Sequence, residues 1–324
     1  MKQVYWFVVL IAVVFSSISR AVDLPGPVIS AQWLSNHLSD VQILEVTKDP
    51  DSFIKVPRYE LNASGKKILV GIDGHIQGSL LMNSKDLWAE RLLNGQKTKY
   101  HIPEQGDFQR LVQSVGVAAN KPIIIVPVGQ DMSDIDEGLR AYWEFKVYGE
   151  ANIAMLDGGL AGWIAAGYIT SSEASPKIRG NWMAQSANQD LIASTSEVMQ
   201  ASRSGDIQLV DSRQPGQFFG LTKRPEVSGY GHIPGAKMFS PELMSRSENG
   251  ASYFLKPSTY AAILQANGIE STDASISYCN TGHLASGSWF ILSEILKNPS
   301  VKLYDGSTYL WTKEGNSLEG VPLN

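Results

Sequence analysis

Apolar and polar residues follow two different periods along the chain. Short, nearly continuous apolar runs are typical of buried strands, whereas apolar residues three and four positions apart indicate helices. The first pattern occupies residues 28–30, 41–46, 68–70, 122–126, 153–156, 209–211 and 274–278. The second occupies residues 31–34, 108–112, 139–148, 196–202 and 285–296. Strands that alternate with helices predict an α/β fold, in which a mainly parallel sheet has helices on both faces.

Several segments occur twice. Gly74-His75-Ile76 returns as Gly231-His232-Ile233, and the strand that ends in Asp157-Gly158 returns before Asp305-Gly306. Self-similarity of this kind predicts two copies of one unit. We place the copies at residues 24–170 and 191–324. The polar segment 171–190, rich in Ser, Ala, Asn and Gln, is the expected linker.

Cys279 is the only cysteine of the 324 residues. It follows the predicted strand 274–278 and precedes the predicted helix 285–296, so it lies in a short loop at the carboxyl end of a strand. Free backbone N–H groups and the helix dipole at such a place favour an anionic sulfur and lower the pKa of a thiol. The alternative is a buried cysteine that serves as a small apolar side chain. In the first copy Pro127 stands at the equivalent position, so that copy has no thiol there.

Four ordered motifs resemble those of the rhodanese sulfurtransferases. They are the loop 279–285, the strand end Asp211-Ser212-Arg213, the segment 231–236 with the sequence GHIPGA, and the closing segment 303–307 followed by Trp311. The resemblance covers most of residues 24–322. It implies a tandem of two rhodanese-like domains with a silent first domain and a catalytic second one.

The resemblance also implies a mechanism without a metal or an organic cofactor. The thiolate of Cys279 is the expected nucleophile, and it stores the transferred sulfur as a persulfide. Backbone N–H groups of the loop form the expected cradle for the donor, and Gly282 permits its tight curvature. The expected substrate-binding residues are Arg213, Asn280, Thr281, Gly282, His283, Leu284 and Ala285.

Two of these residues have alternative roles. Arg213 is expected to bind an anionic donor, because a guanidinium suits an oxyanion, but a salt bridge to a carboxylate is the alternative. His283 stands where many thiosulfate-using relatives carry a basic residue, and it either contacts substrate or is a solvated loop histidine. We interpret Asp211, His232 and its counterpart His75 as structural.

Gln217 bears on the choice of sulfur donor. Relatives that use mercaptopyruvate often have Gly-Arg-Phe where this chain has Gly216-Gln217-Phe218. Without that arginine, thiosulfate is the expected donor and mercaptopyruvate the alternative. Lys223 or Arg224 could substitute for the missing cation.

The first 21 residues differ from the rest. Lys2 precedes an apolar run, and Ser19-Arg20-Ala21 resembles a cleavage site, as in a secretory signal peptide. The run is shorter than the roughly 20 residues that span a bilayer, which argues against a membrane anchor. We therefore expect a periplasmic or secreted protein without stable membrane insertion after cleavage.

Composition narrows the partners. The formal net charge of −5, without a long basic run, argues against nucleic acid. The expected partners are a small-molecule sulfur donor and an acceptor such as cyanide or a thiol, with a protein acceptor as a further candidate. A phosphatase of similar topology would need an arginine that closes the cysteine loop, and this loop closes on Ala285. A persulfide carrier without catalytic activity is the remaining alternative, which kinetics would distinguish.

Overall fold

The computed structural model describes residues 22–65, 67–93, 95–175 and 178–322. The predicted signal peptide therefore lies outside the described residues. In the first half the helices and strands are β1 (Val28–Ile29), α1 (Ala31–Asn36), β2 (Gln42–Thr47), β3 (Arg58–Leu61), β4 (Lys67–Gly71), β5 (Leu80–Asn83), β6 (Ala89–Leu93), β7 (Gln96–His101), α2 (Gln105–Val115), β8 (Ile123–Pro127), α3 (Met132–Val147), β9 (Ile153–Leu156) and α4 (Gly159–Ala165). In the second half they are α5 (Thr195–Ser204), β10 (Gln208–Asp211), α6 (Pro215–Phe218), β11 (Lys237–Met238), β12 (Arg246–Glu248), β13 (Ala251–Tyr253), α7 (Pro257–Ala266), β14 (Ser275–Tyr278), α8 (Ala285–Phe290), β15 (Val301–Leu303) and α9 (Ser307–Lys313).

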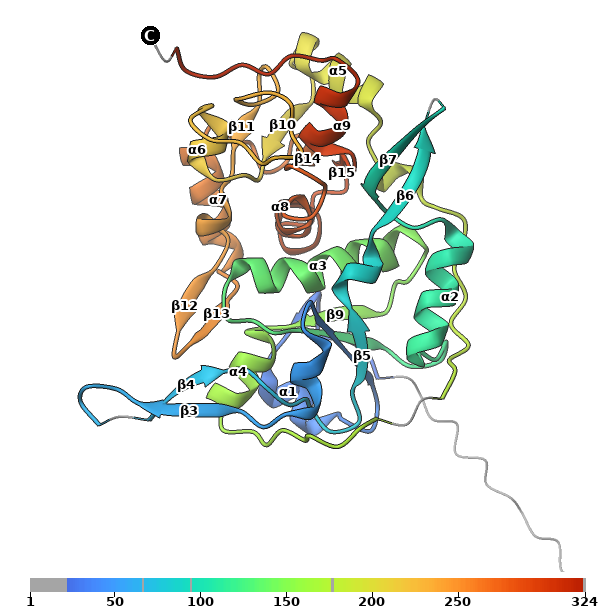
Figure 1. The fold of residues 1–324 in the computed structure, drawn as a ribbon, viewed down its shortest axis with the longest axis vertical. Coiled ribbons are helices and arrows are strands. Elements are labelled where there is room, and N and C mark those ends of the chain that lie inside the picture. The colour runs from blue at the N-terminus through green and yellow to red at the C-terminus, as the bar shows by residue number, and fades with distance from the viewer. Residues whose placement is uncertain (1–21, 66, 94, 176–177, 323–324) are drawn as a thin grey trace, which may run out of the picture.

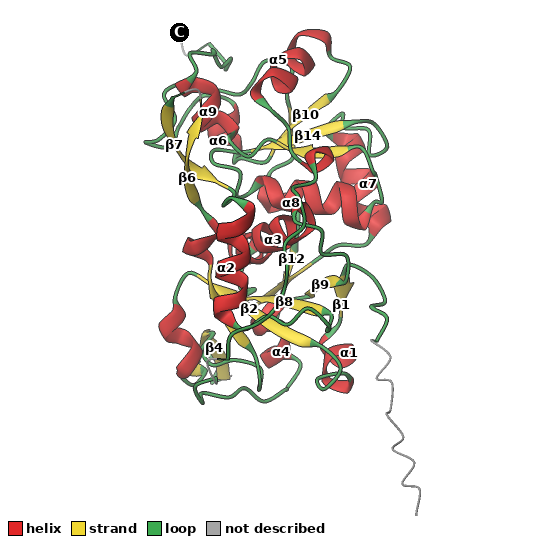
Figure 2. Ribbon diagram, turned by 90° about the vertical axis from the view of Figure 1, so that its right-hand side faces the viewer, coloured by secondary structure: helices red, strands yellow, loops and turns green. Residues whose placement is uncertain are grey.

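Two parallel sheets confirm the predicted fold class. The first has the strand order β1-β9-β8-β2-β5 and the second the order β11-β10-β14-β15. Strands β8 and β14 are buried along their whole length. The continuous apolar run of β8 predicts this, whereas β14 alternates serine with Ile276 and Tyr278. Figures 1 and 2 show each sheet in its own lobe, with helices on both faces.

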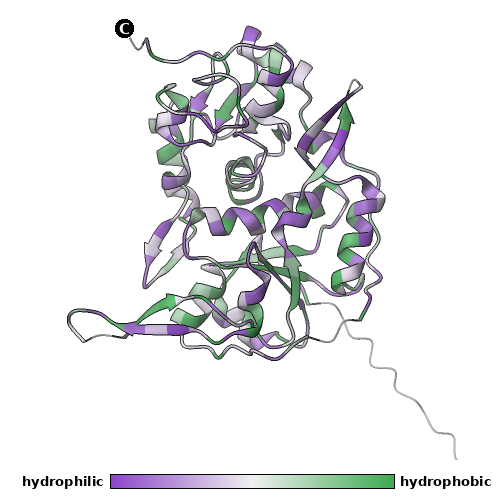
Figure 3. Ribbon diagram, viewed as in Figure 1, coloured by the Kyte–Doolittle hydropathy of each residue, from purple (hydrophilic) through white to green (hydrophobic). Residues whose placement is uncertain are grey.

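Helices α3 and α8 lie between the two lobes and pack against each other (Figure 2). Their apolar residues belong to one core that joins both halves and includes Leu139, Trp143, Trp289 and Phe290. Yet α3 is not apolar throughout. Figure 3 colours several of its turns as hydrophilic, although nearly the whole helix is buried. Buried charges cost free energy unless they are paired. Two charged residues of α3, Arg140 and Glu137, have partners in the loop that follows Cys279.

The repeated motifs make the same contacts in both halves. His75 stacks on Phe53 at 3.8 Å and its Nδ1 lies 2.8 Å from the Phe53 carbonyl, while His232 makes both contacts with Phe218 at the same two distances. These are structural contacts of the kind expected for the two histidines.

Helix α3 begins at Met132, before the predicted start at residue 139. The polar residues Ser133, Asp134, Asp136 and Glu137 hide its first two turns from an apolar pattern. The side chain of Asp131 caps it by accepting from the N–H of Asp134 at 3.0 Å. In α5 the cap is Ser194, and Glu197 completes a capping box.

The antiparallel hairpin β6–β7 is a feature that the sequence did not predict. Its strands are polar and half exposed, with a register shift near Ala89, so they lack a clean alternation. The hairpin belongs to the first half but rises beside α9 of the second (Figure 1). Among the described residues no helix is long and apolar enough to cross a membrane.

Candidate active site

Cys279 directly follows β14, at the carboxyl end of the second sheet. The residue is buried, and the backbone N–H groups of Thr281 and Ala285 donate to its sulfur. Two of the predicted cradle residues therefore direct their N–H groups at the sulfur itself. Thr308 anchors the start of the loop: its N–H and its hydroxyl both donate to the carbonyl of Cys279, each at 3.1 Å.

Ser307 fixes the curvature of the loop from the inside. Its Oγ accepts from the N–H groups of Cys279 and Gly282, both at 3.0 Å, and donates to the carbonyl of Tyr304 at 2.9 Å. Ser307 has a φ of +49°, in the left-handed region that a non-glycine residue seldom adopts. Backbone strain of this kind persists where the surroundings over-determine it, often at functional sites.

The backbone at Gly282 leaves no room for a side chain, as expected. Its N–H group, however, is not free to bind a sulfur donor. Its φ is +77°, and a Cβ there would lie 2.5 Å from the carbonyl oxygen of Asp305. Its N–H is taken by Ser307. Its carbonyl accepts from Nη1 of Arg140, at 3.2 Å. Arg140 lies on α3, so the first domain contacts the active-site loop directly.

Arg140 is the centre of a buried charge network between the domains. Its Nη1 donates to Oδ1 of Asp305 and its Nε to Oε1 of Glu144, both at 2.7 Å. Although burial raises the pKa of Asp305, Arg140 and His101 hold it below its usual range. Asp305 is therefore an anion, and its backbone packs against Gly282.

The pKa of Cys279 contradicts the expectation of a lowered value. Burial raises it, and nearby Asp136 and Asp211 raise it further, against the hydrogen bonds from Thr281 and Ala285. Asp136, on α3, is fully buried against Gly287 and makes no hydrogen bond of normal geometry within the described residues. Burial raises the pKa of Asp136 as well. The sequence predicted the N–H donors. It did not predict the burial of the Cys279 thiol, because that burial depends on contacts with the first domain.

Arg213 is buried beside the site and has a partner. Its Nη2 donates to Oδ2 of Asp211 at 2.6 Å and to the carbonyl of Gly231 at 2.8 Å, and its Nε donates to Asp211 as well. The alternative expected for Arg213 was a salt bridge to an exposed carboxylate, whereas its partner Asp211 is buried. The charge of Cys279 still acts on Arg213, so the guanidinium lies within electrostatic reach of the sulfur. Its role in binding a donor stays a prediction.

Gln217 and Asn280 connect α6 to the loop. Nδ2 of Asn280 donates to Oε1 of Gln217 at 2.8 Å, while Oδ1 of Asn280 is buried and has no hydrogen-bond partner among the residues that the structure describes. The position where relatives that use mercaptopyruvate often have arginine is therefore in direct contact with the residue after Cys279.

His283 faces the first domain instead of bulk solvent. Its Nε2 lies 3.5 Å from Oε1 of Glu137 on α3, and its ring packs edge-on against Trp88 at 5.2 Å. Burial raises the pKa of Glu137, but His283 and Ser84 outweigh it, so the net shift is downward. Leu284 packs against the core shared by both halves. Of the predicted residues, the structure thus brings together Cys279, the loop to Ala285 and Arg213, and it separates none of them.

Sequence reasoning missed Arg140, Asp136, Glu137 and Trp88, all from the half considered silent. A charged residue inside an otherwise apolar helical pattern was the available signal for Arg140. Ser307 is part of the closing segment 303–307, but its positive φ cannot be deduced from the sequence. Within the described residues no group of three or more His, Cys, Asp or Glu could hold a metal ion.

Comparisons with known proteins agree with this geometry. The family model of the rhodanese-like domain matches residues 194–314. A Haloferax volcanii protein named "Putative thiosulfate sulfurtransferase" is 28% identical over 300 residues, covering 91% of this chain and 95% of its own. "Sulfur carrier protein TtuD" of Thermus thermophilus is 27% identical over 313 residues, covering 92% and 96%.

The fold is shared with solved structures. The crystal structure of SseA from Escherichia coli, one of the 3-mercaptopyruvate sulfotransferases, matches with a TM-score of 0.69 and 23% identity, covering 87% of this chain and 98% of SseA. An ergothioneine biosynthesis enzyme from Chlorobium limicola matches with a TM-score of 0.72 and 19% identity, covering 91% and 71%. These two similarities concern the fold alone. The family model and the motifs around Cys279 show that residues 194–314 are a rhodanese-like domain, and the chain is similar over most of its length to the curated thiosulfate sulfurtransferase and sulfur-carrier relatives and shares the fold of SseA.

Proposed function

We propose that this protein is a thiosulfate sulfurtransferase that works through a persulfide on Cys279. The observation that carries the proposal is the position of its sulfur: it lies at a strand end, receives the N–H groups of Thr281 and Ala285, and sits at the boundary of two domains. N–H groups in this arrangement stabilise an anionic sulfur in both the thiolate and the persulfide state. The name of the Haloferax volcanii relative supports the same donor.

The reaction consists of two displacements. The Cys279 thiolate attacks the outer sulfur of thiosulfate and forms a new S–S bond, while the S–S bond of the donor breaks and sulfite leaves with the electron pair. Cyanide or a thiolate then attacks the outer sulfur of the persulfide, and the Cys279 thiolate is the leaving group. No redox co-reactant is needed.

The donor preference rests on the cations near the loop. Thiosulfate is a compact dianion, which the loop N–H groups and Arg213 together suit. Mercaptopyruvate adds a carboxylate that would gain from a second fixed cation, and Gln217 is uncharged. Lys223, one candidate substitute, already donates to the carbonyl of Val227 at 2.9 Å. Mercaptopyruvate is therefore the second candidate donor, and the SseA fold is the observation in its favour.

Mass spectrometry and steady-state kinetics test the proposal. After incubation with thiosulfate, the wild-type chain should gain one sulfur atom on Cys279, and cyanide should release it as thiocyanate. Cys279→Ser should fold with an unchanged circular dichroism spectrum and lose turnover by at least about a thousandfold, because a hydroxyl is a much weaker nucleophile. Thiocyanate production by the folded serine variant at the wild-type rate would contradict the mechanism.

Multiple-turnover kinetics separate a transferase from a carrier. The carrier is the second functional class, favoured by the name of the Thermus thermophilus relative. A transferase produces many thiocyanate molecules per Cys279 with small donors. A carrier loads one sulfur and releases it at a useful rate only to a protein acceptor.

We further propose that residues 1–21 direct the chain out of the cytoplasm. The apolar run before Ser19-Arg20-Ala21 supports this. Fractionation of the source cells, followed by amino-terminal sequencing, should recover a mature chain that begins near Val22. An uncleaved chain in the cytosol would reject the proposal.

A further inference from the structure

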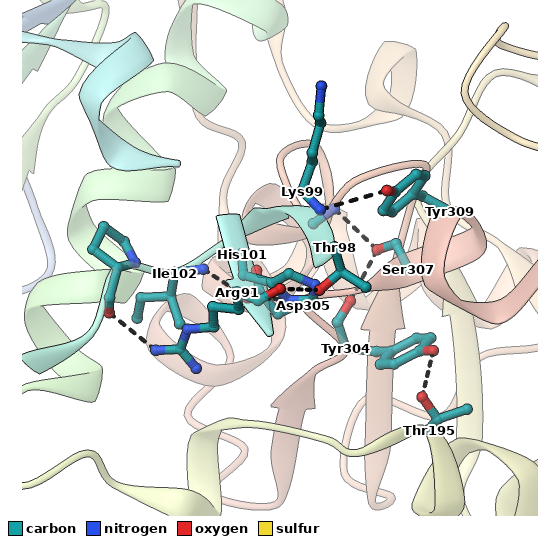
Figure 4. Close-up of polar contacts among 12 residues, drawn as sticks. Arg91, Thr98, Lys99, His101, Ile102, Thr195, Tyr304, Asp305, Ser307 and Tyr309 are labelled. Atoms are coloured by element: carbon teal, nitrogen blue, oxygen red, sulfur yellow. Dashed lines mark hydrogen bonds and ion pairs between the residues drawn. The ribbon is translucent and has the colours of Figure 1, made fainter. Parts of the chain in front are cut away.

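Asp136 has a buried carboxyl group that the proposed mechanism does not use. The residue has no exposed surface, and neither of its oxygens accepts a hydrogen bond of normal geometry from the described residues. Asp305, a second buried carboxyl at the same boundary, shows the usual arrangement: it accepts from Arg140 at 2.7 Å and from the N–H of Ile102 at 2.8 Å (Figure 4). Because a buried charge without partners is costly, the unpaired carboxyl of Asp136 needs a physical explanation.

Helix α3 presents three charged side chains to the loop of Cys279 and to α8. Nη1 of Arg140 donates to the carbonyl of Gly282 at 3.2 Å. Oε1 of Glu137, about one turn earlier, lies 3.5 Å from Nε2 of His283. Asp136 lies four residues before Arg140 and therefore shares the face of α3 that contacts the active-site segment.

The carboxyl group of Asp136 packs against the first turn of α8. A Cβ on Gly287 would lie 2.5 Å from Oδ1 of Asp136, and 3.1 Å from the side chains of both Met132 and Met244. Glycine at this position therefore leaves the room that the carboxyl group occupies beside the methionines. Two residues before Gly287, the N–H of Ala285 donates to the active-site sulfur. The same turn of α8 thus contacts both the carboxyl group and the sulfur.

Asp136 is also the carboxyl group with the largest effect on the thiol of Cys279. Burial is the main cause that raises the pKa of Cys279, and Asp136 contributes more to this shift than Asp211 does. Asp211 has Arg213 as its ion-pair partner, at 2.6 Å, whereas Asp136 has none within the part of the chain that the structure describes. An ionised Asp136 therefore opposes the thiolate without a cation of its own.

The other charged groups around α3 do not neutralise Asp136. Burial, then Glu137 and Asp131, raise its pKa well above the usual range. The basic groups near this helix have other carboxylate partners: Arg140 pairs with Asp305 and Glu144, Lys48 with Asp134, and Lys146 with Glu294, while His283 lies beside Glu137. On the short segments 84–87 and 241–243, which contact α3, the charged residues Lys85, Asp86 and Glu242 are exposed. A buried site of this kind does not readily hold two negative charges, one on the carboxyl group and one on the sulfur.

We propose that Asp136 and Cys279 share a single negative charge and that Asp136 takes up a proton when Cys279 becomes a thiolate. The S–H bond of the thiol breaks and an O–H bond of the carboxyl group forms, so the net charge of the pair is unchanged and no oxidant or reductant is needed. A neutral carboxyl group does not repel thiosulfate, which is a dianion. Asp136 thus acts on the reaction through Cys279, as a positioning residue supplied by the half without a thiol. The inference rests on the proposed function, in which Cys279 is the nucleophile.

The pH dependence of alkylation by iodoacetamide tests this pair, since Cys279 is the only thiol of the chain. Two acids that interact by more than about 1 pK unit lose their protons in two steps, so the alkylation rate of the full-length protein should rise in two steps with pH. Asp136→Asn leaves one step, and its midpoint should lie about 1 pH unit below the upper step of the wild type. Between the two steps the variant should react about threefold faster, because a roughly tenfold larger thiolate fraction is partly offset by the weaker nucleophilicity of a thiolate with a lower pKa.

A matched variant and a second substitution complete the experiment. Asp107→Asn removes an exposed carboxylate on α2 and should leave the profile unchanged. Asp136→Ala replaces the asparagine variant if circular dichroism shows that the latter does not fold, and it should give the same single step. A folded Asp136 variant with the wild-type profile, or with a midpoint above the upper step of the wild type, would overturn the proposal. Alkylation needs no sulfur donor, so a lowered midpoint without thiosulfate turnover rejects only the proposed function, whereas thiosulfate turnover with an unshifted midpoint rejects only the shared charge.

Discussion

Ser307 uses one hydroxyl to hold two backbone N–H groups of the active-site loop, at the cost of a strained backbone. Ser307→Ala keeps the strain and removes the acceptor, which leaves the buried N–H groups of Cys279 and Gly282 unpaired. We expect a loss of about 2–6 kcal/mol of unfolding free energy, from about 1–3 kcal/mol for each of the two unpaired groups. Turnover should fall at least about tenfold, because the loop loses its shape.

Ser307→Gly is the matched comparison. It also removes the hydroxyl, but it relieves the positive φ, so it should be more stable than the alanine variant by roughly 1 kcal/mol. Urea unfolding and the thiosulfate–cyanide assay measure both effects. If the alanine variant retained wild-type turnover and stability, the hydroxyl would not shape the loop.

Gln217 is the residue through which we expect donor choice to change. It contacts Asn280, so Gln217→Arg places a cation next to the cysteine loop. A charged hydrogen bond is worth about 1.5–3 kcal/mol, and the ratio of kcat/KM for mercaptopyruvate to that for thiosulfate should rise roughly ten- to a hundredfold. Gln214→Arg, an exposed position three residues earlier, serves as the control. An unchanged ratio in Gln217→Arg, or a wild-type preference for mercaptopyruvate, would assign donor choice to other residues.

Among the helices and strands, α3 makes the contacts through which the first half, which has no thiol, affects the loop of Cys279 in the second half. Four of its charged residues, Asp136, Glu137, Arg140 and Glu144, are buried at the domain boundary. A buried ion pair is weak evidence for stability, but breaking one strands a charge. The network therefore makes the loop around Cys279 depend on a helix that is far away in the sequence.

Arg140→Met tests this dependence. The change removes the guanidinium from the anionic Asp305, which keeps only His101 beside it, and from Glu144, whose pKa burial raises to about 8. We expect a loss of about 3–5 kcal/mol in unfolding free energy, mainly from Asp305. Turnover should fall more than KM changes, because the loop carbonyl of Gly282 loses its donor. Arg140→Lys keeps the charge but not the forked geometry, so it should recover stability better than turnover.

The alkylation rate of Cys279 by iodoacetamide gives a readout that stability alone does not move. At a temperature where both Arg140 variants are folded, the rate should differ from the wild type. An identical rate and identical turnover would show that Arg140 is only a structural residue.

At the scale of the whole molecule, the two halves differ in the partners that they provide for a buried carboxyl group at equivalent positions. Asp211 has Arg213 as its partner, whereas its counterpart in the first half, Glu45, accepts only from the N–H of Ile76 at 2.6 Å and from Ser79 at 3.0 Å. Burial raises the pKa of Glu45 to about 8. In the unfolded chain the same group titrates near 4.3.

The sign of the resulting pH dependence follows from proton counting. Between about pH 4.3 and 8 the folded chain keeps the proton of Glu45 while the unfolded chain releases it, so unfolding free energy falls as pH rises through this window. The slope from this residue is at most about 1.4 kcal/mol per pH unit. Glu45→Gln keeps an acceptor oxygen and should flatten the slope between pH 5 and 8. Denaturation at a series of pH values measures it, and equal slopes for variant and wild type would contradict the assignment.

Much of the fold could be predicted from the sequence because several motifs occur in both halves. The alternation of strand and helix patterns predicted the parallel sheets, and the position of Cys279 after an apolar run predicted a loop at the end of a strand. The missed parts depend on contacts between the copies: the pKa of Cys279 is set by burial, and the partner of His283 is Glu137 on α3. Hairpin β6–β7 was missed for a local reason, since its polar strands show no period. The sequence predicted a donor-binding role for Arg213 but not the identity of its carboxylate partner, Asp211.

The hydrogen bond from Arg140 to Gly282 also has an evolutionary reading. If the two halves arose by duplication, the copy with Pro127 in place of the nucleophile would be free of catalytic constraint, were it not for the contact between its Arg140 and Gly282 of the other copy. Helix α3 of the first copy supports the loop of the second copy. Selection on catalysis in the second copy would therefore also act on side chains of the first. Substitutions in α3 should therefore be constrained by the reaction, and the second copy cut out alone should be a sheet that folds around a poorly shaped loop.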